Sequence, residues 1–197
     1  IDEEGTRIEP TLWSEDLEAR IVEESRTPEE RRGDLLAQIA ANRRGIERVA
    51  AQFRQRGDGL MAAAGELQDY SERFMRRQID DFPDGTFEFE DVLDGDGFGN
   101  GPLPIRCRLT IDGDQVEFDF RETVDQTEGP VNVPRAVTVS AVLYVLRCLA
   151  PPELPSNGGD MRCSRILTRP GILVDARAPA PVAIGNVETS QRLTDVT

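Results

Sequence analysis

The sequence contains neither histidine nor lysine, so all 23 basic side chains among its 197 residues are arginines. Without histidine the chain has no imidazole to act as a general base or a metal ligand. Without lysine it has no amine for a Schiff base and no lysine for a phosphate-binding P-loop. The chain alone therefore cannot form a serine hydrolase triad or a conventional nucleotide site. Any chemistry here must use carboxylates, hydroxyls, thiols, arginine or groups from another chain.

Positive charge is scarce beside negative charge: 37 acidic residues against 23 basic ones give a formal net charge of −14. Electrostatic repulsion therefore opposes binding to nucleic acid or to anionic lipid. The longest apolar run, residues 136–150, is interrupted by Thr138, Ser140 and Arg147. It falls short of the roughly 20 residues that cross a bilayer. We expect neither nucleic acid nor membrane as a partner, and a cytoplasmic location.

Cysteine is also rare, and Cys107, Cys148 and Cys163 share no CxxC spacing. An odd number of widely spaced cysteines argues against a disulfide framework and against a zinc site. We predict buried free thiols in a reducing compartment. Cys163 is the candidate for a reactive thiol, because it lies in a loop-like stretch.

Apolar residues before position 80 recur at intervals of three and four, which predicts helices. A short helix is predicted over residues 14–25 with Ser14 as its N-cap. Another is predicted to begin near Thr27, whose hydroxyl can cap it, with Pro28 at the first helical position. The two clearest periodic stretches, residues 34–56 and 60–79, are separated only by a glycine-containing turn. We expect these two to pack as an antiparallel helical hairpin.

Beyond residue 85 the periodicity changes from helical to alternating, which is typical of half-buried strands. Asp112-Gly113 is the strongest hairpin signal, and a type I′ turn there requires positive φ at both central residues. The elements predicted for this half are strands over 86–90, 103–111, 115–120, 166–167 and 172–174 and a helix over 134–149.

Together these elements predict an α+β fold, in which an antiparallel helical hairpin packs beside a mainly antiparallel β-sheet. We expect a helical region over residues 1–82 and a β-rich region with one buried helix over 83–197, joined in one compact unit of a larger subunit. The first residue is not methionine, and the acidic N-terminus has no apolar segment like that of a signal peptide. We interpret the chain as an internal segment of a longer protein.

Residues 94–100, Asp-Gly-Asp-Gly-Phe-Gly-Asn, invite comparison with a calcium-binding loop. Phe98 occupies the fifth position and Ile105 the twelfth, where the calcium loop needs an oxygen ligand and a bidentate glutamate. We therefore predict a flexible loop between strands.

A second acidic group begins at the end of a predicted strand, where Asp119 is followed by Glu122, Thr123 and Asp125. Carboxylates in such a place can coordinate Mg²⁺ or act as general bases. Turn formation and solvation explain them equally well, so the sequence leaves both interpretations open.

The stretch over residues 185–192 places six polar side chains directly after an apolar, proline-rich segment. One interpretation is a helix N-terminus capped by the hydroxyl of Thr189 or Ser190. The other is a site for a polar ligand, made of Asn186, Glu188, Thr189 and Arg192. The two interpretations are equally compatible with the residue types.

The string Asn186-Val187-Glu188-Thr189-Ser190-Gln191-Arg192 is the most specific motif of the chain, and further motifs precede it in a fixed order. They are Glu4-Gly5, Ile8-Glu9-Pro10, residues 33–41, Pro83-Asp84-Gly85, Asp119-Phe120, Gly129-Pro130-Val131-Asn132, residues 140–149 and Pro155-Ser156-Asn157-Gly158-Gly159. In this order they resemble the hydantoinase B family, which includes the corresponding half of 5-oxoprolinase and related carboxylase subunits. Two loops depart from the family pattern: Arg121-Glu122-Thr123 replaces a Ser-Gly-Thr-like segment, and residues 160–163 replace a Phe-Arg-Pro-like one.

The resemblance implies ATP-dependent opening of a cyclic amide, such as hydantoin or 5-oxoproline, in a hetero-oligomer with a hydantoinase A-type, ATP-binding partner. In that scheme ATP binds to the A subunit, which phosphorylates the amide carbonyl oxygen, and the B subunit directs water onto the activated carbon. ATP therefore enters through the partner. Any divalent metal would be bound outside this segment, which by itself is not expected to hold a metal or to be active.

Within this scheme we name candidate site residues. We expect Glu188 to act as a base or as a metal ligand, Arg192 to hold a phosphoryl or carboxylate group bidentately, and Asn186 to orient a carbonyl. The substrate-binding candidates are Asn186, Thr189, Asn132 and Asp34. Two alternatives stay open: a segment of an ATP-dependent ketone carboxylase, and a non-catalytic scaffold whose helical hairpin docks the A subunit.

Overall fold

The computed structural model describes residues 8–197, and the chain divides into two compact units between Ala63 and Ala64. The acidic N-terminus and the Glu4-Gly5 motif lie outside the described residues. This division lies inside the helix over Gly59–Asp80 and does not coincide with the predicted boundary between residues 82 and 83. The predicted boundary stays a prediction. In chain order the elements are α1 (Glu15–Glu23), α2 (Pro28–Arg56), α3 (Gly59–Asp80), β1 (Gly85–Leu93), β2 (Leu103–Asp112), β3 (Gln115–Asp119), α4 (Arg135–Cys148), the 3₁₀ helix η1 (Gly158–Met161), β4 (Ser164–Leu167) and α5 (Glu188–Val196).

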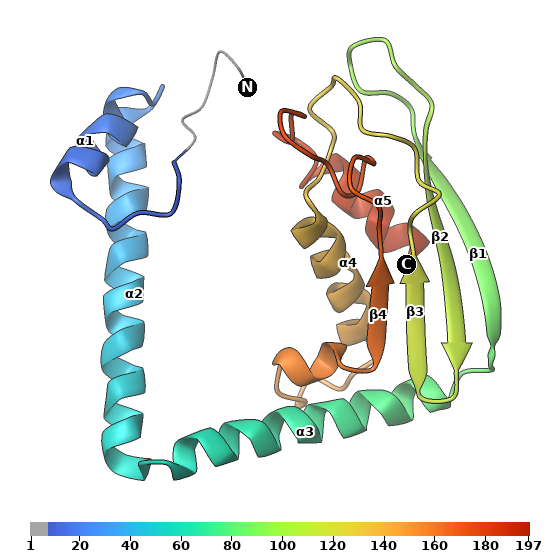
Figure 1. The fold of residues 1–197 in the computed structure, drawn as a ribbon, viewed down its shortest axis with the longest axis horizontal. Helices are drawn as coiled ribbons and strands as arrows, with labels where there is room; N and C mark the ends of the chain where they lie inside the picture. The colour runs from blue at the N-terminus through green and yellow to red at the C-terminus, as the bar shows by residue number, and fades with distance from the viewer. Residues whose placement is uncertain (1–7) are drawn as a thin grey trace. The chain divides into compact units, whose positions relative to one another are not determined.

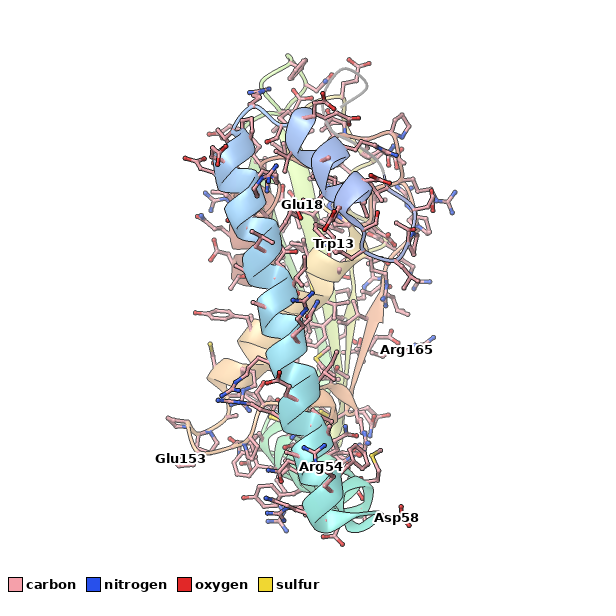
Figure 2. The ribbon with its side chains drawn as sticks, turned by 90° about the vertical axis from the view of Figure 1, so that its left-hand side faces the viewer. Trp13, Glu18, Arg54, Asp58, Glu153 and Arg165 are labelled. Carbon is pink, nitrogen blue, oxygen red and sulfur yellow. The ribbon has the colours of Figure 1, made fainter. Side chains whose placement is uncertain are left out.

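The first unit is helical, and its helix starts follow the predicted capping signals in part. Ser14 caps α1, because its hydroxyl accepts a hydrogen bond from the Leu17 amide at 3.1 Å. Thr27 is the N-cap residue of α2, but the prediction that its hydroxyl caps the helix is wrong, because its side chain makes no capping hydrogen bond. The predicted placement of Pro28 at the first helical position is confirmed. Pro28 has a fixed φ suited to a first helical position, so the helix starts without that hydroxyl. Figure 2 shows Glu18 on α1, whose carboxylate lies 3.7 Å from Arg32 of α2.

The long helix α2 carries the predicted apolar stripe, but none of its residues is buried. It belongs to the first unit, whereas most of α3 belongs to the second, so the antiparallel packing of the two helices stays a prediction. Among residues 8–197, no helix combines the length and apolar composition that crossing a bilayer requires.

The second unit contains a four-stranded sheet in the order β1-β2-β3-β4 (Figure 1). β1 and β3 pair antiparallel with β2, whereas β4 runs parallel to β3. The parallel pair is possible because α4 lies in the long connection between β3 and β4, which returns the chain to the same end of the sheet. The predicted α+β class with a mainly antiparallel sheet is confirmed.

Two details of the predicted strands are wrong. Asp112 pairs with Gln115, so the hairpin turn consists of Gly113 and Asp114, and Gly113 alone has a positive φ, +55°. Positive φ at the first central residue only is the geometry of a type II′ turn, not of type I′. The predicted strand over 172–174 is reduced to isolated bridges at Ile172, because this segment finds no continuous strand to pair with.

The core of the second unit lies between the sheet and the helices α4 and α5, which cover the same face (Figure 1). Alternate residues of β2 point into this core, as the period of two requires. Its largest fully buried side chains include Phe120, Met75, Ile105, Leu146, Ile172, Leu173 and Leu193. Helix α5 packs against α4 and against β1 and β2, which places the polar string of residues 186–192 at one border of the core.

The second-unit part of α3 is held by polar contacts to the loop that contains η1. Arg162 donates to Asp69 Oδ1 at 2.7 Å and to Glu72 Oε2 at 3.1 Å. The buried Ser71 hydroxyl accepts a hydrogen bond from Asn157 Nδ2 at 2.8 Å. Asn157 also begins η1 with a reciprocal capping box. The Asn-Gly-Gly motif thus forms a structural joint with α3.

Candidate functional site

The polar string over residues 186–192 forms the start of α5, as one of the two interpretations predicted. The capping part of that interpretation is wrong, because Val187 is the N-cap residue and makes no side-chain capping bond. Thr189 and Ser190 lie inside the helix, after its first residue Glu188. The Ser190 hydroxyl donates backward to the Asn186 carbonyl at 2.7 Å and caps no amide of the helix.

Glu188 and Arg192 are exposed and lie one helical turn apart on α5. Arg192 Nη1 lies 3.1 Å from Asp91 Oδ2 of β1 and 3.3 Å from Asp195 Oδ2. Its Nε and Nη2 donors make no hydrogen bond to any residue in the described part of the chain, and neither does the Glu188 carboxylate. One side of the guanidinium therefore joins α5 to β1, while the other side remains available to a planar anion.

Thr189 and Asn132 are buried, with no exposed side-chain surface. The Thr189 hydroxyl donates to the Val131 carbonyl. Asn132 accepts from the Thr127 amide at 2.8 Å and donates to the carbonyls of Thr127, Gly129 and Pro181, each at 2.9 Å. Every polar atom of both side chains is thus engaged by the protein, and a substrate-binding role for Thr189 and Asn132 stays a prediction.

A groove of about 320 Å³ lies between α4 and α5 beside the same string. It contains the predicted candidate Asn186 and adds residues that sequence reasoning missed. Its lining consists of Val137, Ser140, Ala141, Asn186, Ser190, Gln191 and Thr194. Polar residues on the outward faces of two neighbouring helices were the only available signal, and that signal does not reveal which helices pack together.

Asp34, the remaining candidate, lies on α2 in the first unit. Its carboxylate is exposed and lies 3.5 Å from Arg31 Nη1, one turn away. This i,i+3 pair is an ordinary contact of a solvated helix face. A substrate-binding role for Asp34 stays a prediction.

The acidic group after β3 is neutralised by arginines. Asp119 Oδ1 and Oδ2 accept from the Arg121 guanidinium at 2.9 and 2.7 Å, and this arginine holds the pKa of Asp119 below its ordinary value. Asp125 pairs with Arg169 at 2.5 Å. Over residues 8–197 no three acidic, cysteine or histidine side chains are arranged to hold a metal ion. Turn formation and ion pairing account for these residues.

The three cysteines differ in burial. Cys107 and Cys163 are buried and Cys148 is exposed, so the prediction of three buried thiols is wrong for Cys148. Burial raises the pKa of Cys107 to about 12 and also raises the pKa of Cys163. The choice of Cys163 as the reactive thiol is wrong, because its sulfur is shielded and its neutral form is favoured.

A thiol reagent at pH 8 is therefore expected to label Cys148 first. Cys107 and Cys163 should react at least about 100-fold more slowly, since each must first be exposed by local opening. Mass spectrometry of labelled peptides over time measures the three rates. All three should react at similar rates in denaturant, and labelling of Cys163 as fast as Cys148 under native conditions contradicts the prediction.

The family model described as hydantoinase B/oxoprolinase matches residues 1–197, the whole chain. The chain belongs to the hydantoinase B/oxoprolinase family. The resemblance carried by the ordered motifs is thereby confirmed.

Relatives with names of this family are found in distant organisms. 5-Oxoprolinase 1 of Arabidopsis thaliana is 37% identical over 180 aligned positions, which cover 83% of this chain and 14% of the plant protein. A putative D-/L-hydantoinase B subunit of a Pseudomonas species is 34% identical over 161 aligned positions, which cover 76% of this chain and 27% of that protein. This chain thus spans less than a third of the length of these relatives.

A solved structure shares the fold. The crystal structure of ATP-dependent caprolactamase from Pseudomonas jessenii superposes with a TM-score of 0.86 at 28% sequence identity. The match covers 97% of this chain and 34% of the caprolactamase chain. The fold of this chain is therefore shared with that caprolactamase.

The two loops that depart from the family pattern use their unusual residues for structural contacts. Arg121 neutralises Asp119, as described above. Asp160 is fully buried, and one of its oxygens lies 3.3 Å from Arg147 Nη1 of α4. Its other oxygen, Oδ1, has no hydrogen-bond partner within the described chain. In this chain Arg121 and Asp160 thus make ion pairs inside their loops or to a neighbouring helix.

Proposed function

We propose that this chain is a segment of the B subunit of an ATP-dependent enzyme that opens a cyclic amide together with an ATP-binding A subunit. The observation that supports this most strongly is the family match over all 197 residues. The names of relatives agree: they include 5-oxoprolinase, a hydantoinase B subunit and the beta subunit of caprolactamase. Each of these names denotes a protein acting on a ring that contains an amide bond.

In the proposed reaction the A subunit transfers the γ-phosphoryl group of ATP to the amide carbonyl oxygen, releasing ADP. Water then adds to the activated carbon, the ring C–N bond breaks, and phosphate leaves. Glu188 is suited to take the proton from that water, because its exposed carboxylate has no competing partner in residues 8–197. The open side of Arg192 is suited to hold the phosphoryl oxygens.

The groove between α4 and α5 would supply the neutral polar contacts of such a site. Asn186 and Gln191 offer amide groups, which can donate to a carbonyl and accept from a ring N–H. Thr189 and Asn132, which are buried, would contribute indirectly, because their hydrogen bonds fix the start of α5. No group in this proposal binds ATP, in agreement with the missing lysine and histidine.

Replacing Glu188 by glutamine tests this assignment in the full-length protein with its A partner. We expect the rate of ATP-dependent hydrolysis of 5-oxoproline, hydantoin or caprolactam to fall by about 100-fold or more, since glutamine cannot accept a proton. Glu153→Gln is the matched control, because Glu153 is exposed on the loop after α4 and makes no predicted substrate contact (Figure 2). Unchanged turnover in the Glu188 variant would remove Glu188 from the mechanism.

The substrate assay also separates the alternatives. Turnover of a cyclic amide that requires both subunits supports the amidohydrolase. ATP hydrolysis stimulated by a ketone and bicarbonate, without amide turnover, would instead indicate the carboxylase.

A scaffold role has one observation in its favour: α2 contains no buried residue and exposes Leu36, Ile46, Val49 and Phe53. Full activity after replacement of the polar string, with assembly lost after changes on α2, would support the scaffold.

A further inference from the structure

The loop between β1 and β2 is organised around a single buried carboxylate. Asp96 is only 3% exposed, although residues on both sides of it are exposed. Its Oδ1 accepts from the amides of Phe98 at 2.8 Å and Asn100 at 3.1 Å, and its Oδ2 accepts from Asn100 Nδ2 at 2.7 Å. The predicted loop between two strands is present, and these contacts organise it around Asp96, while its flexibility stays a prediction.

Two more donors reach Asp96 from a distant segment. The Thr127 hydroxyl donates to Oδ2, and the Gly129 amide donates to the same oxygen at 3.1 Å. Hydrogen bonds from Thr127 and Asn100 hold the pKa of Asp96 well below its ordinary range. Gly129 lies so close that a Cβ there would lie 2.3 Å from the Asp96 carbonyl oxygen. The β1–β2 loop and the turn over residues 127–129 are therefore held together through Asp96.

The same turn is joined to the segment that leads into α5. The Asn132 side-chain amide donates hydrogen bonds to the carbonyls of Thr127 and Gly129 and also to that of Pro181. The Ile184 amide donates to the Pro130 carbonyl at 3.0 Å. A Cβ on Gly185 would lie 2.0 Å from the Asn132 carbonyl oxygen, so the two backbones are in direct contact there. Asn186 and Glu188 follow immediately.

We propose that Asp96 is a positioning residue, whose carboxylate fixes the Thr127–Asn132 turn and through it the start of α5 with Asn186 and Glu188. It contacts neither of these two residues itself, and its effect passes through Thr127, Gly129 and Asn132. The link to catalysis rests on the proposed function, whereas the link to the position of residues 182–190 rests on geometry alone.

The experiment compares Asp96→Asn with Asp94→Asn in the full-length protein. Both changes remove one negative charge from the same loop, but Asp94 is exposed. Asparagine at position 96 presents an NH₂ group toward donors that need an acceptor, so the contact to Thr127 or Asn100 is lost. Hydrogen–deuterium exchange of peptides from 127–132 and 182–190 is the direct readout, and the Ile184 amide reports on the contact to Pro130.

We expect exchange of the 182–190 segment to become about 10-fold faster or more in Asp96→Asn and to stay as in wild type in Asp94→Asn. Exchange in β2 and α4 should stay unchanged in both. Where turnover is measurable, kcat should fall in Asp96→Asn with the KM for ATP unchanged. Faster exchange confined to residues 94–101 overturns the proposal, as does equal behaviour of the two variants.

A milder pair covers the case in which Asp96→Asn does not fold. Thr127→Val removes one hydroxyl from the network, and Thr127→Ser retains it. Faster exchange at Ile184 in the valine variant, restored in the serine variant, supports the proposal, whereas equal exchange in both overturns it. Failure of the proposed function is distinguishable: wild-type protein without any amide turnover removes the catalytic link, while the exchange data still decide the positioning role.

Discussion

Replacing Phe120 by alanine is expected to lower the free energy of unfolding by about 3–5 kcal/mol. Phe120 has no exposed surface, and its amide donates to the Leu167 carbonyl at 2.9 Å at the end of the parallel strand pair. Alanine would leave an apolar cavity in the middle of the core, which the surrounding side chains can only partly fill. Chemical denaturation measured by circular dichroism gives the change.

Phe98→Ala is the control for this variant. Phe98 is 69% exposed on the loop between β1 and β2, so its removal should change the free energy of unfolding by no more than about 0.5 kcal/mol. Similar losses in the two variants would contradict the assignment of Phe120 to the core.

Replacing Gly159 by alanine is expected to destabilise the protein by about 2–3 kcal/mol, although only one methyl group is added. A Cβ at this position would lie 2.0 Å from the backbone carbonyl oxygen of Gln68 in α3. A backbone atom cannot move aside as the end of a flexible side chain can. Relief would require η1 to separate from α3, which would also stretch the hydrogen bond from Asn157 to Ser71.

The neighbouring Gly158 provides a matched control within the same 3₁₀ helix. It is exposed, and a Cβ there would meet no atom within 4 Å. Gly158→Ala should therefore change the free energy of unfolding by less than about 0.5 kcal/mol. Thermal or chemical unfolding of the pair measures the difference, and equal stabilities would show that α3 and η1 do not approach each other so closely.

The Gly159 prediction concerns a family motif that was recognised in the sequence without its physical meaning. The Asn157-Gly158-Gly159 motif helped to identify the hydantoinase B family. The motif alone does not show that Gly159 lies against Gln68 of α3, 91 positions earlier in the chain. The first glycine faces solvent. Only the packing of α3 against η1 distinguishes them.

The candidate site, too, was only partly predictable from the sequence. The polar string was visible as an unusual cluster, and its helical start was one of two stated interpretations. The sequence did not show that Thr189 points into the core while Glu188 points outward, because the direction of the buried face of α5 depends on β1 and α4. Nor did it show that Arg192 meets Asp91, a residue 101 positions away.

By itself the sequence determined helices α1 to α4, most of the strands, the α+β class and the family, because these depend on local periodicity, turn residues and motif order. Missing histidine and lysine likewise limited the possible chemistry without any coordinates. Only the tertiary structure decided that Asp96 is buried, that Cys163 is shielded, and that α4 and α5 form a groove beside Asn186. Those outcomes depend on which distant segments meet, and short-range patterns in a chain carry little information about such contacts.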